Sequence, residues 1–224
     1  MIYGINIDGV DTYSEYGLIL CADLKISKPE PKFKYVSVPE MNGALDLTES
    51  LTGSVTYGQR EISFNLFAAY DVISGRPSPP DEENFTIILA RFSEFIHGKK
   101  HKVWFPDDSS FYFEGRLKVG DKGSFRSGII PVSMTAGAYK MKNERTLTLG
   151  PRVRIQVSNT GEPIYPVFTK NTTGTAVVMI DYGTVYETVT VPYGTTVSTA
   201  PLKYGNNTVE ANAEVSMTYR ERRL

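Results

Sequence analysis

Apolar and polar side chains alternate along short segments of this chain, and the alternation constrains the fold more than any other feature. In residues 62–70 every second position, from Ile62 to Tyr70, is apolar, with Ser63 and Asn65 on the other side, and residues 209–219 alternate without a break. A period of two puts one set of side chains on each face of a β-strand. The 12% aromatic content and the many Val and Thr residues also favour strands. We therefore predict a mostly-β chain in which these segments are strands with one buried and one solvated face.

One segment has the period of a helix instead. Its apolar residues are spaced by three and four positions, at Phe85, Ile88, Leu89, Phe92 and Ile96. Carboxylates at residues 81–83 come before them and complement the positive end of a helix dipole, while Gly98 and two lysines follow as a stop signal. The spacing predicts a helix over residues 81–97, placed between strands.

Strand and turn signals divide the chain into two parts. An Asp8-Gly9 turn predicts an opening hairpin, and strands return over residues 103–135 after the helix. The stretch 140–145 is poor in core residues and is a candidate linker. Short strands without a helical period then suggest a small β-sandwich. We predict an antiparallel β-sandwich-like domain with one α-helix and an extended arm over residues 1–145, and a second domain over residues 146–224.

The predicted arm covers residues 38–58, which are polar and punctuated by glycine. They have too few large apolar residues for a core, and in a monomer we expect their backbone groups to have only water as partners. Laid across a neighbouring subunit, the arm would add strands to it. The candidate interface residues are Val38, Pro39, Met41, Asn42, Leu45, Leu47, Leu51, Val55 and Tyr57.

Composition excludes several classes of protein. The net charge is −1, so electrostatics indicates no polyanionic partner and no sequence-specific nucleic-acid binding. Cys21 is the only cysteine, which excludes an intrachain disulfide, and packing explains it better than nucleophilic chemistry. The sequence has no basic amino-terminal region with a following apolar run and no apolar window of transmembrane length. We expect neither secretion nor membrane insertion by the chain itself.

Groups that could bind a metal or perform catalysis have simpler structural interpretations. His97 and His101 are four residues apart, but Gly98 is expected to end the helix between them and no third ligand is apparent. The acidic pairs at 82–83 and 107–108 fit the first turn of a helix and a turn between strands. We predict no catalytic residue, no metal site and no cofactor.

Aromatic residues allow an alternative function. Trp104, Tyr112 and Phe113 could stack on a sugar, although packing in the core of a β-domain explains these aromatic residues with fewer assumptions. Tyr182, Tyr186 and Tyr193 fall near turns of the second domain, where a lectin would place them. The alternative function is therefore a carbohydrate-binding module that recognises a cell-wall glycan.

The order of short motifs along the chain resembles a known family. These motifs are Tyr3-Gly4-Ile5-Asn6-Ile7-Asp8-Gly9 with residues 16–18, residues 38–48, Tyr57-Gly58-Gln59-Arg60-Glu61-Ile62, residues 95–99, 104–108 and 111–117, and the closing residues 204–209 and 219–224. Together they are similar to the distal tail protein (Dit) family of long-tailed, non-contractile phages, over most of the chain. The sequence departs from the family pattern at Glu40-Met41, where a glycine or a small residue is expected.

The resemblance implies a structural virion protein rather than an enzyme. It implies a hexameric ring, alone or stacked, at the junction between the tail tube and the adsorption apparatus. The amino-terminal domain would build the ring, and a galectin-like carboxy-terminal sandwich would project outward. The implied partners are the tail tube protein, a tail-associated tip or lysin protein and receptor-binding proteins. DNA would pass through the ring without being read, and the protein would be made in the bacterial cytoplasm and reside at the tail tip.

Overall fold

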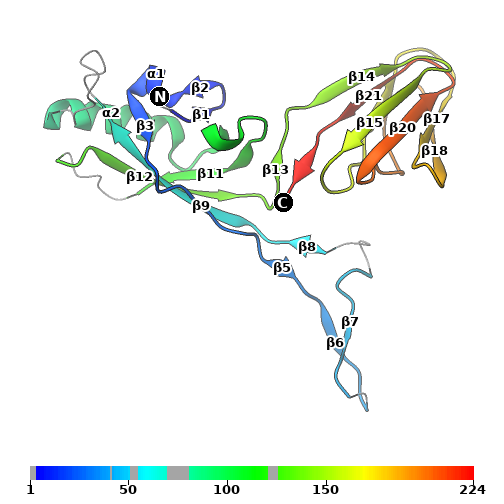
Figure 1. The fold of residues 1–224 in the computed structure, drawn as a ribbon, viewed down its shortest axis with the longest axis horizontal. Helices are drawn as coiled ribbons and strands as arrows, with labels where there is room; N and C mark the ends of the chain where they lie inside the picture. Colours follow the sequence, from blue (N-terminus) through cyan, green and yellow to red (C-terminus); the bar gives the residue numbers. More distant parts are fainter. Residues whose placement is uncertain (1–3, 41, 51–54, 70–80, 121–125) are drawn as a thin grey trace. The chain divides into compact units, whose positions relative to one another are not determined.

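The chain folds into two compact units, each with its own core. The structure, a computed structural model, describes residues 4–40, 42–50, 55–69, 81–120 and 126–224 (Figure 1). The first unit is Met1–Ala138 and the second is Tyr139–Leu224. The two hydrophobic cores share no residue. The chain is therefore mostly β with two units, as predicted.

The division between the units falls earlier than the predicted boundary after residue 145. The predicted linker contains strand β13 (Lys140–Met141), which pairs with β22 (Arg222–Arg223) near the end of the chain. Lys142 Nζ also donates to the Glu221 carboxylate at 2.8 Å. These contacts are both within the second unit, so residues 140–145 belong to that unit instead of linking two domains.

An eight-stranded antiparallel sheet forms most of the first unit. Its order is β2-β1-β10-β11-β12-β9-β3, with β4 also paired to β9. The strands are β1 (Asn6–Ile7), β2 (Val10–Asp11), β3 (Leu18–Leu20), β4 (Lys25–Ile26), β9 (Arg60–Ala68), β10 (Lys100–Trp104), β11 (Phe113–Val119) and β12 (Ile129–Ala136). The longest contact in the sheet joins β9 to β12, where Phe64 lies opposite Val132.

Strand β9 confirms the predicted alternation. Ile62, Phe64, Leu66 and Ala68 are buried, while Ser63 and Asn65 lie on the other face. The predicted strand extended to Tyr70, which lies outside the described residues. One face of this sheet therefore contacts the core. The opposite face has polar residues such as Ser63 and Asn65, and also an apolar row of Ile19, Phe67 and Ile129.

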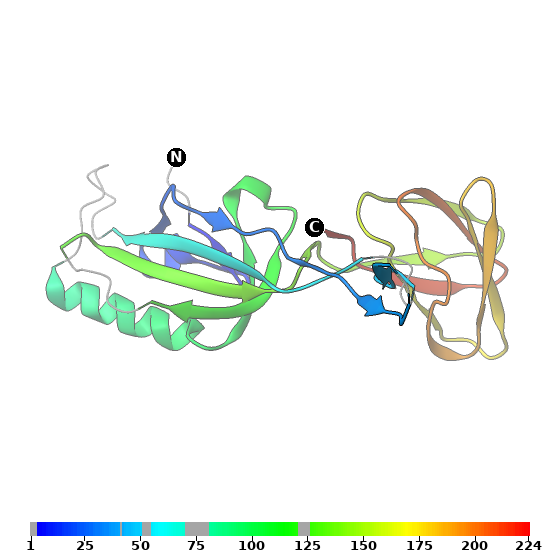
Figure 2. The same ribbon diagram turned by 90° about the horizontal axis from the view of Figure 1, so that it is seen from below.

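Helix α2 (Glu82–Ile96) covers the apolar face of the sheet (Figure 2). The Asp81 side chain caps its first turn by accepting from Asn84 N at 2.8 Å. Phe85, Phe92 and Ile96 are buried in the same cluster as the apolar residues of β9. The bounds agree with the predicted helix over residues 81–97.

A second helix, α1 (Thr12–Tyr16), was not predicted. It occupies a single short turn between β2 and β3 and ends at Gly17, whose φ of 65° favours glycine. The buried Thr12 hydroxyl accepts from Ile5 N at 3.0 Å and donates to Leu18 O at 3.1 Å. This one side chain therefore joins the segments on both sides of the helix. Periodicity could not reveal it, because five residues are too few to establish a helical pattern.

The second unit is a sandwich of two four-stranded antiparallel sheets around one core. One sheet has the order β14-β21-β16-β19 and the other β15-β20-β17-β18. The strands are β14 (Arg145–Leu149), β15 (Arg154–Asn159), β16 (Val167–Lys170), β17 (Ala176–Asp181), β18 (Tyr186–Val191), β19 (Gly194–Val197), β20 (Gly205–Ala211) and β21 (Val215–Tyr219). The predicted hairpin around residues 181–185 is confirmed as β17 and β18.

The alternating segment 209–219 is two strands, so the prediction of one continuous strand is wrong. Residues 209–211 close β20 in one sheet, and β21 belongs to the other. Between them, the Asn212 side chain accepts from Val177 N at 2.8 Å and ends the ladder. The chain crosses the sandwich there while its apolar side chains still point into the shared core, which is why the alternation shows no break.

Within the described residues, no helix is long and apolar enough to cross a membrane.

Candidate assembly interface

The predicted arm is one side of a two-stranded ribbon. The chain leaves β4, runs through β5 (Pro31–Lys32) and β6 (Tyr35–Ser37), turns, and returns through β7 (Ala44–Asp46) and β8 (Thr56–Tyr57) to β9 (Figure 1). β6 pairs with β7, and β5 pairs with β8. Many of its backbone groups thus bond within the ribbon, and the expectation that they would have only water as partners is wrong. Residues 31–37, which the predicted arm excluded, form its outgoing side.

The far end of the ribbon turns through two residues with positive φ. Gly43 has a φ of 99° and Glu40 a φ of 65°. The second value is unusual, because a side chain at positive φ meets its own backbone. Glu40 is also the position at which the sequence departs from the family pattern, where glycine or a small residue is expected. The glutamate therefore adopts the conformation that such a residue would favour.

A polar network around Asp46 joins the two sides of the ribbon. The Asp46 carboxylate accepts from Thr48 N at 2.9 Å and also from the Thr48 hydroxyl. Thr48 Oγ1 in turn accepts from Lys34 N at 3.0 Å, and Leu47 N donates to Lys34 O at 2.8 Å. The hydrogen bond from the Thr48 hydroxyl, followed by the one from its backbone N–H, lowers the pKa of the Asp46 carboxyl below its usual value.

We expect acid to open this network. A carboxyl whose pKa is lowered by folding stabilises the fold above its unfolded pKa of 3.8, and the contribution is lost as the pH falls through the folded value. An NMR titration of the Asp46 carboxyl should therefore give a pKa below 3.8. Thr48→Val removes the hydroxyl and should raise that pKa, whereas Ser50→Ala, four residues from Asp46, should leave it unchanged. Equal pKa values in the parent and Thr48→Val would contradict this role of the hydroxyl.

Large apolar side chains of the ribbon are exposed. Phe33 and Tyr35 are 59% and 60% exposed, with ring centroids 6.1 Å apart. Val36, Val38 and Leu45 are also exposed. An isolated two-stranded ribbon is marginally stable in water, and these side chains keep much of their apolar surface exposed to solvent. Tyr35 and Val36 are consecutive in β6 and point to opposite faces of the ribbon, and Leu45 lies opposite Val36. We name Phe33, Tyr35, Val36, Val38 and Leu45, on the two faces together, the apolar ribbon patch, and a partner that enclosed the ribbon would stabilise it.

The structure brings most of the predicted interface residues together on this ribbon. Val38, Pro39, Asn42 and Leu45 are exposed in its outer half, while Leu47, Val55 and Tyr57 are half-buried. Met41 and Leu51 lie outside the described residues. Sequence reasoning missed Phe33, Tyr35 and Val36. The available signal was the run of large apolar residues directly after the prolines at 29 and 31, where no core segment was expected.

The two histidines contact different groups. His101 is buried, and its Nδ1 lies 2.6 Å from Asp8 Oδ2. His97 Nδ1 accepts from Val119 N at 3.2 Å. In the part of the chain that the structure describes, no group of three or more His, Cys, Asp or Glu residues could hold a metal ion.

The other candidate groups of the first unit have structural positions. Tyr112 and Phe113 are buried, as core packing predicts, and the half-buried Trp104 packs on Tyr112 with a centroid distance of 4.9 Å. The acidic pair at 82–83 lies in the first turn of α2, and the acidic pair at 107–108 forms part of the 3₁₀ turn η1 (Pro106–Asp108). Cys21 is half-buried, and burial followed by the nearby Asp23 raises the pKa of its thiol, which opposes the thiolate that a nucleophile needs.

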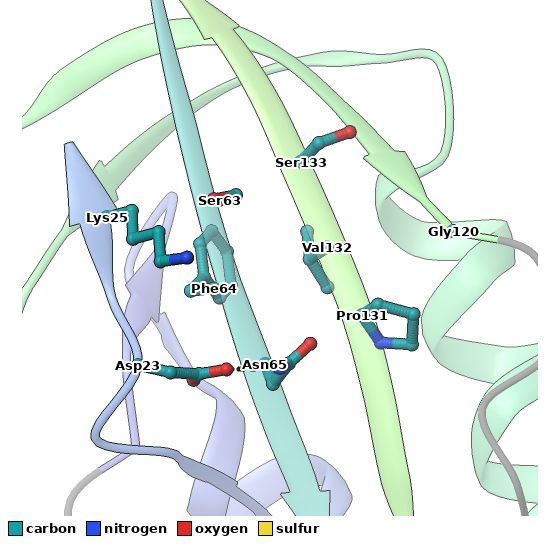
Figure 3. Close-up of a pocket in the computed structure, with 9 residues that line it drawn as sticks. All are labelled: Asp23, Lys25, Ser63, Phe64, Asn65, Gly120, Pro131, Val132 and Ser133. Atoms are coloured by element: carbon teal, nitrogen blue, oxygen red, sulfur yellow. Dashed lines mark hydrogen bonds between the residues drawn. The ribbon is translucent and has the colours of Figure 1, made fainter. Parts of the chain in front are cut away.

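A shallow groove of about 280 Å³ lies on the face of the first sheet that carries Ser63 and Asn65 (Figure 3). Lys25, Ser63, Asn65 and Ser133 reach into it from neighbouring strands, and Asn65 donates to the Asp23 carboxylate. Among the residues that line it, Asp23 is the one carboxylate and Lys25 the one cation.

Comparison with protein-family models gives no match, and neither does comparison with curated proteins. Among solved structures, the chain is similar to the crystal structure of the Dit protein (gp 19.1) of phage SPP1. The TM-score is 0.63 at 13% sequence identity, and the match covers 100% of both chains. This chain has the Dit fold. The Dit fold extends over both units, since no part of either chain is left out of the match.

The SPP1 protein is described as a paradigm of the hub of the adsorption apparatus in phages that infect Gram-positive bacteria. The Dit-like fold therefore agrees with the family that the sequence motifs resemble. With an identity of 13%, the shared property is the arrangement of strands and helix.

Proposed function

We propose that this chain is a structural subunit of a phage tail, a distal tail hub that forms a ring between the tail tube and the tail tip. The full-length likeness to the SPP1 Dit protein carries this proposal. The proposed ring of this chain is hexameric and lets DNA pass. The further partners in this proposal are the tail tube protein, a tip or lysin protein and receptor-binding proteins. Its location is the tail tip of the virion.

The exposed ribbon supplies a physical means of closing the ring. A ribbon that docks on the next subunit makes a head-to-tail contact, and repeated head-to-tail contacts close into a ring when the rotation between subunits allows it. Each subunit then gives its apolar ribbon patch to one neighbour and receives a ribbon from the other. Burying the patch removes apolar surface from water, which the monomer does not achieve.

The charge of the chain is compatible with the passage of DNA. A protein that neutralises phosphates with Lys and Arg holds the duplex tightly, and this binding strengthens as the salt concentration falls. The net charge of −1 favours no such retention. In this proposal DNA passes through the ring as cargo and is not read.

Microscopy and mass measurement of the purified full chain test the proposal. Negative-stain images are expected to contain closed rings with six-fold symmetry, and light scattering should give six times the monomer mass of 24.9 kDa. A species that remains monomeric at micromolar concentration and in the presence of a tail tube protein would refute it.

A further inference from the structure

A groove of about 390 Å³ opens on the second unit where three strands of one sheet part. The pairing of β14 with β21 ends at Arg145, which lies opposite Tyr219. The pairing of β16 with β21 ends at Val167, which lies opposite Thr218. The chain of β21 continues beyond both of these ends towards Arg222. It thereby forms the floor of a groove between the segment before β14 and the segment before β16.

Charged groups face the groove with unused hydrogen-bonding capacity. Glu144 lies on one side and Arg220 on the floor, with 3.8 Å between Oε1 and Nη2. That distance is too long for a hydrogen bond. Within the described part of the chain the Glu144 carboxylate makes no hydrogen bond, so it is available as an acceptor and Arg220 as a donor.

Tyr165 stands on the opposite side of the groove on a rigid backbone. The preceding Ile164 exchanges two hydrogen bonds with Leu202, of 3.1 and 2.6 Å. Prolines at 163 and 166 fix the backbone on both sides, and Arg222 Nη2 donates to Pro163 O at 2.9 Å. The Tyr165 side chain nevertheless remains 53% exposed. An exposed aromatic ring beside a groove, carried on a fixed backbone, offers a surface on which an apolar face can stack.

An uncharged sheet surface continues from the groove. Thr146, Thr218, Val167 and Val197 form one row across the four strands, and Thr148, Ser216, Thr169 and Thr195 form the next. Thr218 and Val167 also line the groove. Some of these hydroxyls pair with each other, as Thr146 Oγ1 does with Thr218 Oγ1 at 3.0 Å. Because a hydroxyl both donates and accepts, each can also bond to an external hydroxyl.

We propose that the groove and this hydroxyl surface bind an extended glycan. A saccharide ring would stack on Tyr165 through its C–H face and present its hydroxyls to Glu144 and Arg220. Further saccharide units would follow Thr146 and Thr218 of the first row and the Thr and Ser residues of the second. The chemistry favours a glycan over other occupants. The hydroxyl surface has no charge to hold a polyanion, and an apolar protein face laid on it would leave buried Thr and Ser hydroxyls without hydrogen-bond partners from outside. The proposal concerns the second unit and does not depend on ring formation.

The proposed site does not contain the tyrosines that the sequence analysis named as candidate glycan contacts. The Tyr182 hydroxyl donates to Pro201 O at 2.8 Å, and Lys203 Nζ lies 3.8 Å from its ring centroid, so both its polar group and its face are occupied. Tyr193 is 68% exposed but lies between β18 and β19, outside the lining of the groove. Tyr193 is consequently a matched control for Tyr165.

The test applies the full-length chain to an array of neutral and acidic oligosaccharides and measures the affinity of the retained oligosaccharide by calorimetry. Tyr165→Ala should weaken binding about tenfold or more, since it removes the stacking surface. Glu144→Gln should weaken it roughly tenfold to a hundredfold, because a charged acceptor is lost. Tyr165→Phe keeps the ring and should retain the parent affinity, as should Tyr193→Ala.

Two outcomes would overturn the proposal. One is an array on which the folded parent chain retains no oligosaccharide. The other is a Tyr165→Ala variant that binds as well as Tyr193→Ala. Circular dichroism of each variant shows that it is folded, and light scattering reports ring formation separately, so failure of glycan binding is distinct from failure of the proposed assembly.

Discussion

The double variant Phe33→Ser/Tyr35→Ser is expected to be a folded monomer that no longer forms rings. Both side chains belong to the exposed ribbon, and neither contributes to either hydrophobic core. Burying an aromatic side chain of this size in an interface stabilises it by about 1.5–3 kcal/mol. Losing two of them per contact should weaken each subunit contact at least a hundredfold, since about 1.4 kcal/mol corresponds to a factor of ten.

Light scattering at a series of protein concentrations measures this effect. A matched control is Ile87→Ser, which removes an apolar side chain of helix α2 that is 49% exposed but lies outside the ribbon. The control should form rings as the parent does, and circular dichroism should show that both variants are folded. Intact rings in the double variant would show that Phe33 and Tyr35 are not needed for the contact between subunits. Dissociation of the control as well would indicate a general loss of solubility or stability.

The sequence predicted those elements whose pattern is set locally. Helix α2 has a cap, a five-residue apolar stripe and a stop signal, so its bounds could be predicted closely. Strand β9 was recognisable because one of its faces is buried over its whole length. In both cases the side chains that meet the core follow the period of the element itself.

Features that depend on distant residues could not be predicted in this way. The charged segment 140–145 looks like a linker until its partners near the chain end, such as Glu221 and Arg222, are placed beside it. The continuous alternation through 209–219 conceals a change of sheet, because both strands face the same core. Neither case leaves a signal in the local pattern.

The candidate interface was predicted in position and only partly in structure. A polar, glycine-rich segment without core residues correctly indicated an extension, and Val38, Pro39, Asn42 and Leu45 do lie exposed on it. The outgoing strand was missed because its pairing with residues 44–46 depends on the returning chain, and the local pattern of residues 31–37 does not show that pairing. Their exposure is visible only once the ribbon is seen to pair with itself.

Replacing Phe168 with alanine should destabilise the second unit and leave the first unit almost unchanged. Phe168 is fully buried in β16 between β21 and β19, in a core made only of residues from the second unit. Truncating a buried phenylalanine costs about 3–5 kcal/mol, because apolar contacts are lost and a cavity remains. That cost is a large share of the stability of a small domain, which is about 5–15 kcal/mol.

The single tryptophan allows the two units to be followed separately. Trp104 lies in β10 of the first unit against Tyr112, so its fluorescence reports unfolding of that unit. During urea unfolding, Phe168→Ala should shift the transition of second-unit amides in hydrogen exchange and leave the Trp104 transition in place. Phe92→Ala, in the centre of the first core, should do the reverse. If Phe168→Ala moved the Trp104 transition as far as the second-unit amides, the two cores would unfold as one cooperative structure, and the separate cores would not correspond to separate folding units.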